Sequence, residues 1–253
     1  MKKKAISFFF SVFIISTAVY SIELNNTLKI LIEVPNEKAG ETTLIAINRI
    51  RESVNSNIDV VYTSATNELR NKYGLSIILG ASKDSPELQH HWQNHSSAKE
   101  DSYLIYSISK EPLVVIASGV DIRGTLYAAY HLADLLKTDV DISNLKLFFQ
   151  PKVSKRYASV SAITHGGRYY RPSLFYKSLK ELPRYGYNGV VITPGRKSPI
   201  DQYSSPVSET EEGEFYSDIY NTIEWENFFN EIKKYQLDIM IGIRIFLYRT
   251  TVE

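Results

Sequence analysis

The sequence of 253 residues contains no cysteine, so the protein can form no disulfide and carry no lipid-modified cysteine. It also lacks a phosphate-binding glycine loop, a G-x-S-x-G nucleophile motif and a dinucleotide-binding fingerprint. Neither sign of charge dominates, because 29 basic and 28 acidic residues leave a net charge of +1. This balance gives no electrostatic reason to expect nucleic acid or an anionic membrane as a partner. The hydrophobic fraction of 43% is that of a globular protein and excludes a collagen-like or disordered chain.

The amino terminus has the pattern of a secretory signal peptide. Lys2–Lys4 precede an apolar run from Ala5 to Val19, and Val19 and Ser21 suit a cleavage site after residue 21. A membrane anchor is the alternative, but it would need roughly 20 apolar residues. We therefore expect residues 1–21 to be removed and the protein to be exported, to the periplasm or out of the cell. Loss of the three lysines lowers the 29 basic residues to 26 against 28 acidic ones, a charge of −2. No later run reaches membrane-spanning length, so no membrane partner is expected after cleavage.

Residues 22–138 alternate between strand and helix patterns. Strand patterns cover residues 28–34, 58–62, 75–79, 103–108 and 112–117, and helical spacing covers residues 40–54 and 121–137. The last two strands lie so close together that they predict an antiparallel hairpin, which turns at Lys110 and Glu111. This order predicts a small α/β domain with helices packed on one face of a sheet.

Residues 139–155 show no strong periodicity, and we interpret them as a linker. Strand patterns then cover residues 156–164, 187–193 and 237–246, alternating with helical patterns over 172–185 and from residue 221. Apolar strands in strict alternation with helices predict parallel β/α units. A long polar loop over residues 194–220 follows the second of these strands, where α/β proteins place substrate contacts.

Three short motifs stand at the starts of successive elements: D-x-R-G at 121–124, P-x-x-x-x-R at 151–156 and G-x-N at 186–188. From the residues alone, Asp121 is expected to cap a helix and Gly124 to let that helix approach the sheet closely. In order and spacing the motifs resemble segments of α-glucuronidases and β-N-acetylhexosaminidases. In these glycoside hydrolases a small accessory α/β domain precedes a (β/α)8 catalytic barrel.

The resemblance implies an α/β fold, with an accessory domain over residues 22–138 and an incomplete (β/α)8 barrel over residues 156–253. A complete barrel needs roughly 200 to 250 residues, whereas only 98 lie between Arg156 and Glu253. In the family the catalytic acid and its partner lie at or beyond the end of the fourth barrel strand, so we expect no catalytic residue in this chain. We interpret the chain as the truncated amino-terminal portion of a secreted glycoside hydrolase, inactive by itself. An α-glucuronidase-like and a hexosaminidase-like substrate class both remain open.

A different class of protein remains as the alternative. An exported carbohydrate-binding or assembly protein without catalytic activity could have the same accessory domain and the same start of a barrel. Whether the chain is an enzyme is therefore left open, as is its oligomeric state. Carbohydrate is the expected partner in either case.

Candidate substrate-binding residues come from the barrel portion. Arg156 resembles an arginine that holds hydroxyl groups of the terminal sugar, and its planar guanidinium suits two adjacent hydroxyls or a carboxylate. The alternative is an arginine that extends into solvent at the start of a strand. The loop after the first barrel strand adds four further candidates that could stack on a sugar or pair with a uronate: His165, Arg168, Tyr170 and Arg171. A solvated loop is the alternative for these four.

No cofactor and no metal ion are expected. His91 and His95 are four residues apart and could share one face of a helix, as a pair of metal ligands does. The surrounding segment is polar and offers no third ligand, which favours a surface position for both histidines.

Overall fold

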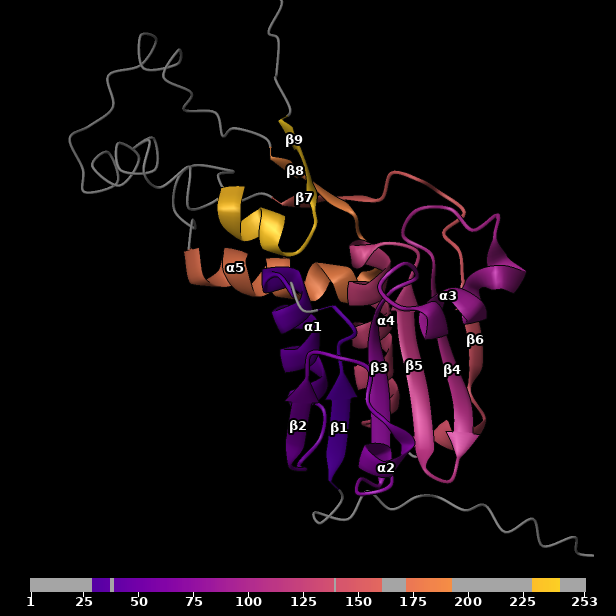
Figure 1. The fold of residues 1–253 in the computed structure, drawn as a ribbon. Coiled ribbons are helices and arrows are strands. Elements are labelled where there is room, and N and C mark those ends of the chain that lie inside the picture. Colours follow the sequence, from indigo (N-terminus) through magenta and orange to yellow (C-terminus); the bar gives the residue numbers. More distant parts are fainter. Residues whose placement is uncertain (1–28, 37–38, 139, 161–171, 193–228, 242–253) are drawn as a thin grey trace, which may run out of the picture.

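A computed structural model describes residues 29–36, 39–138, 140–160, 172–192 and 229–241 (Figure 1). The predicted signal peptide lies outside these residues. Across the parts of the chain that are described, no helix is both long enough and apolar enough to cross a membrane.

The larger unit of the structure is a six-stranded mixed sheet. Its strands are β1 (Ile30–Glu33), β2 (Ile58–Val61), β3 (Leu75–Ala81), β4 (Tyr103–Lys110), β5 (Leu113–Gly119) and β6 (Lys146–Phe149). They lie in the order β2-β1-β3-β5-β4-β6 (Figure 1). β1 is parallel to β2 and β3, β3 is parallel to β5, and β4 is antiparallel to both of its neighbours. The hairpin predicted from the sequence is confirmed as β4 and β5.

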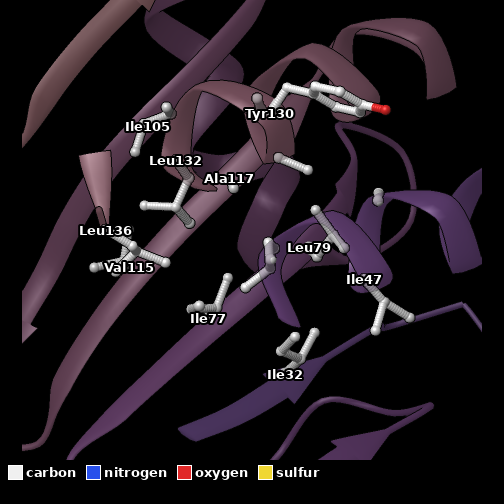
Figure 2. Close-up of a cluster of buried hydrophobic side chains, with 14 of the residues drawn as sticks. Ile32, Ile47, Ile77, Leu79, Ile105, Val115, Ala117, Tyr130, Leu132 and Leu136 are labelled. Carbon is white, nitrogen blue, oxygen red and sulfur yellow. The ribbon is translucent and has the colours of Figure 1, made fainter. Parts of the chain in front are cut away.

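Two long helices cover one face of this sheet. They are α1 (Glu41–Arg51) and α4 (Ile122–Leu135), which are the two helices that the sequence predicts. Figure 2 shows their apolar side chains against the sheet, with Ile47 of α1 and Leu132 of α4 beside strand residues such as Ile77 and Val115. Their packing on the same face confirms the predicted α/β arrangement.

The opposite face is covered by a helix that the sequence did not predict. This helix, α3 (Pro86–Trp92), packs Leu88 and Trp92 against Ile78, Val114 and other strand residues that alternate with those of the first face. The sequence pattern does not indicate this helix, because the helix is short and has only two buried residues. The remaining short elements are α2 (Asn67–Arg70), η1 (Gln93–His95) and η2 (Ile142–Asn144).

Part of the predicted linker belongs to the sheet. Residues 146–149 form β6, which pairs antiparallel with β4 at the edge of the sheet. The strand produces no clear period in the sequence because it is only four residues long and because Phe148 and Phe149 both remain exposed, at 39% and 47%. The linker of residues 139–155 is therefore shorter than predicted.

The second unit is a three-stranded parallel sheet with strands in chain order. Its strands are β7 (Tyr157–Val160), β8 (Gly189–Ile192) and β9 (Asp238–Ile241). α5 (Pro172–Glu181), η3 (Leu182–Tyr185) and a helix that includes residues 229–234 accompany it. A small core joins the helices to the sheet through Leu179, Leu182, Val190, Ile232, Tyr235 and Leu237. The predicted parallel β/α order is confirmed for these elements.

Candidate functional site

The carboxyl ends of the three parallel strands lie at one edge of the second sheet. Val160 of β7 pairs with Ile192 of β8, which in turn pairs with Ile241 of β9. In barrels built from β/α units, substrate contacts come from the loops that follow these strand ends. The predicted contacts His165, Arg168, Tyr170 and Arg171 follow β7 along the chain but lie outside the described residues. Their role stays a prediction.

Arg156 is the one predicted site residue that the structure describes, and it lies at the opposite edge. It directly precedes β7, at the amino end of the strand. Its guanidinium donates from Nη2 to Asp101 Oδ2 at 2.8 Å, from Nη1 to the Val153 carbonyl at 2.7 Å, and from Nε to the Gly186 carbonyl. The side chain therefore bonds within the protein rather than extending into solvent. A contact between Arg156 and sugar stays a prediction.

The carboxylate of Asp101 is the buried centre to which Arg156 binds. Its side chain is only 5% exposed, and the residue has a left-handed backbone with φ of 65°. Asp101 Oδ2 also accepts from Asn188 Nδ2 at 2.9 Å, and Oδ1 accepts from Arg123 Nη1 at 3.4 Å. The sequence pattern does not indicate Asp101, because this residue lies in a polar loop before β4 and its partners are far along the chain.

Arg123 extends the cluster to the third strand. Its Nη2 donates to Asp238 Oδ1 at 2.9 Å, and the Tyr157 hydroxyl donates to Asp238 Oδ2 at 3.4 Å. Burial acts to lower the pKa of Arg123, but the carboxylates of Asp101 and Asp238 outweigh it and raise that pKa. Arg156, Asp101, Arg123 and Asp238 therefore form a line of alternating charge, which we call the junction cluster.

The start of α4 holds Arg123 in place. Asp121 caps the helix by accepting from the Gly124 backbone N–H at 2.7 Å, and its other oxygen accepts from the Asp101 N–H at 3.0 Å. A Cβ on Gly124 would overlap the Ser102 carbonyl oxygen, so only glycine fits at this close approach. The cap and the close approach predicted from the sequence are both confirmed.

Asn188 connects the cluster to the second strand. Its Oδ1 accepts from the Arg156 backbone N–H at 2.8 Å, and its own backbone N–H donates to the Arg156 carbonyl at 2.9 Å. The Asp238 N–H donates in turn to the Asn188 carbonyl at 2.9 Å. The three motifs at 121–124, 151–156 and 186–188 therefore meet in one place.

The histidines of α3 and η1 form a separate aromatic group. His95 Nε2 lies 2.8 Å from the Tyr106 hydroxyl, and its ring stacks on Phe148 with centroids 4.0 Å apart. Burial, followed by the charge of His90, lowers the pKa of His91. Among the described residues, no three histidine or carboxylate side chains gather closely enough to hold a metal ion.

Comparison of the sequence with protein-family models and with curated proteins gives no match. Solved structures do match, among them a family GH115 4-O-methyl-α-glucuronidase with specificity for decorated arabinogalactans (TM-score 0.52, 13% identity). A GH138 enzyme targeting pectin rhamnogalacturonan II (TM-score 0.52, 16% identity) and the protein CpGH84D (TM-score 0.52, 10% identity) match in the same way.

These matches define the fold. They cover 83%, 84% and 88% of this chain but only 28%, 31% and 36% of the three matched chains, in the same order. The chain therefore has a glycoside hydrolase-like fold and spans about a third of the length of the proteins it resembles.

Proposed function

We propose that this chain is the amino-terminal portion of an exported glycoside hydrolase that acts on a polysaccharide or oligosaccharide. The observation that carries the proposal is the match of more than four fifths of the chain to glycoside hydrolases, across both sheets. Two of the matched proteins act on polysaccharides: one has specificity for decorated arabinogalactans, and the other targets pectin rhamnogalacturonan II. A carbohydrate of this kind is the proposed ligand.

The sugar would bind at the carboxyl edge of β7–β9. His165, Arg168, Tyr170 and Arg171 are the proposed contacts, because aromatic rings stack on sugars and guanidinium groups pair with hydroxyls or a uronate carboxylate. A direct contact from Arg156 has less support, since its guanidinium already donates to three acceptors at the other edge. We propose that the catalytic carboxylates of the complete enzyme are not among these residues.

Binding of acidic and neutral oligosaccharides tests the proposed site. Isothermal titration of the purified chain with glucuronoxylan fragments and with N-acetylglucosamine oligosaccharides would compare the two open substrate classes. The double variant R168Q/R171Q should lose most of the binding to the uronate-containing ligand. The matched control R184Q removes an exposed arginine that pairs with Asp134 near α5, and it should bind as the wild type does. Equal binding by both variants, or no binding to either ligand, would refute this site.

An activity assay tests the proposed lack of catalysis. Aryl glycosides, including an aryl glucuronide and an aryl N-acetylglucosaminide, should remain intact when incubated with the purified chain. Clear turnover would overturn this part of the proposal. Reading the gene beyond codon 253 separates the two classes of protein. A continuing frame with an acidic residue after a fourth strand supports an enzyme, and its absence supports the non-catalytic binding protein.

Export is tested independently of sugar binding. Expression with the native amino terminus should deliver a processed protein whose first residue is Ile22, as read by amino-terminal sequencing. A protein that keeps residues 1–21 after fractionation would contradict the proposed signal peptide.

A further inference from the structure

The shortest hydrogen bonds of the Asp101 carboxylate cross from one sheet unit to the other. Asp101 belongs to the loop between η1 and β4 of the six-stranded unit. Within that unit its carboxylate accepts one bond of 3.4 Å, from Arg123. Its bonds to Arg156 and Asn188, at 2.8 and 2.9 Å, come from residues that lead into β7 and β8.

The junction cluster, together with Asn188, reaches the amino end of every strand in the three-stranded sheet. Arg156 directly precedes β7, Asn188 directly precedes β8, and Asp238 is the first residue of β9. The first residues of the three strands also pair with one another, Tyr157 with Gly189 and Gly189 with Asp238. One buried carboxylate and one arginine of the six-stranded unit therefore contact all three strand starts.

The contacts of the junction cluster should weaken when one of its charged side chains is removed. Hydrogen bonds between charged groups are stronger than neutral ones, and a buried charge that loses its partner is strongly destabilising. Removing the charge of Asp101 would leave Arg156 and Arg123 next to a neutral group, with side chains about one fifth exposed. The affected bonds join Asp101 to Arg156 and Asn188 at the starts of β7 and β8, and to Arg123, which pairs with Asp238 at the start of β9.

We infer that Asp101 is a positioning residue, through which the six-stranded unit fixes the alignment of the first three barrel strands. The stability of the six-stranded unit itself depends on other contacts, because its core of apolar side chains lies between the sheet, α1 and α4. The inference concerns the arrangement of the two units and does not depend on the identity of any sugar ligand.

Hydrogen–deuterium exchange of the full chain tests this inference. The variant D101N is suitable because asparagine tolerates the left-handed backbone of residue 101 and keeps the side-chain shape. We expect amide exchange in β7, β8 and β9 to become about tenfold faster. The charged hydrogen bonds at the starts of β7 and β8 are weakened directly, and β9 pairs with β8. Exchange in β3 and β5 should stay within about twofold of the wild type, because these strands lie in the separate core.

A matched control removes a buried carboxylate that serves the six-stranded unit alone. Glu33 is fully buried and pairs with Arg70, so E33Q should accelerate exchange in β1 and β3, which D101N should not do.

Two results of the D101N experiment would overturn the inference. They are exchange in β7–β9 within about twofold of the wild type, and equal acceleration in β3 and β7. If D101N does not fold, R156Q removes the crossing bond to Asp101 together with the bonds to the Val153 and Gly186 carbonyls, while the carboxylate stays in place. Exchange should then rise in β7–β9 and not in β3 and β5, and a uniform increase over both sheets would overturn the inference.

Discussion

Arg70 and Glu33 form a bidentate ion pair. Arg70 Nε donates to Glu33 Oε1 and Arg70 Nη2 donates to Glu33 Oε2, both at 2.7 Å. Glu33 ends β1 and has no exposed surface, and Arg70 is the last residue of α2. The hydrogen bond to Glu33 is the main cause that raises the pKa of Arg70, so the guanidinium stays charged although it is buried. This ion pair attaches the four-residue helix α2 to strand β1.

Neutralising Glu33 should therefore destabilise the protein strongly. E33Q leaves the buried guanidinium without its closest partner, and a loss of about 3 kcal/mol in the free energy of unfolding is expected. Urea denaturation followed by circular dichroism measures the change. E68Q removes an exposed carboxylate from the same helix and should change stability by less than about 0.5 kcal/mol. Equal effects of the two variants would contradict this account.

G124A should be destabilising although alanine is the better helix former. The added Cβ would overlap the backbone carbonyl oxygen of Ser102, which cannot move without disturbing the start of β4. We expect a loss of about 2 kcal/mol or more, in the range of overpacked sites. At Gly40 a Cβ meets nothing within 4 Å, so G40A serves as the control, with a cost of about 1 kcal/mol or less. Thermal denaturation of both variants measures the two costs. A G124A melting temperature at or above that of the wild type would contradict the close approach of Gly124 to the Ser102 carbonyl.

Trp92 depends on one hydrogen bond within the core. Its Nε1 donates to Ser118 Oγ at 2.9 Å, and the tryptophan is 6% exposed. S118A leaves this buried donor without an acceptor and should cost about 1 to 3 kcal/mol. Equilibrium unfolding in urea measures the loss, and S64A, which alters an exposed serine, should have almost no effect. Unchanged stability in S118A would contradict the assigned bond.

The protein should lose stability as the pH falls below neutrality. Burial is the main cause that lowers the pKa of His131, and the nearby Asp134 only partly opposes it. In the unfolded chain the pKa of histidine is about 6.5, so the unfolded state takes up more protons than the folded state as the pH falls past this value. Stability from the neutral ring is therefore present above about pH 6.5 and is lost as the pH falls through the lower folded value.

H131Q removes the titrating ring and tests this pH dependence. The decrease in melting temperature between about pH 7.5 and pH 5 should be smaller in the variant than in the wild type. The Tyr103 hydroxyl lies 3.1 Å from His131 Nδ1, so the variant also alters this contact. The comparison therefore uses the change in melting temperature with pH and not its absolute value. A decrease of the same size in both would show that other groups cause the acid sensitivity.

The elements that could be predicted from the sequence are those whose signal is local. α4 has its cap at Asp121 and a regular apolar face, and the β4–β5 hairpin has two apolar runs close together. β6 could not be predicted, because a short edge strand with two exposed phenylalanines gives no periodic pattern. The role of Asp101 could not be predicted either, since its partners Arg156 and Asn188 lie 55 and 87 residues away. Such contacts follow from the tertiary fold and leave no mark in the spacing of neighbouring residues.

The junction cluster also bears on how proteins of this shape can diversify. In the described part of the chain, it contacts β7, β8 and β9 through residues at their amino ends. The proposed sugar-binding residues follow the carboxyl end of β7. In barrels, residues at the amino face serve stability and those at the opposite face serve specificity. Mutation can therefore change the length and composition of the segments that follow the carboxyl ends while the contacts that join the two units stay the same.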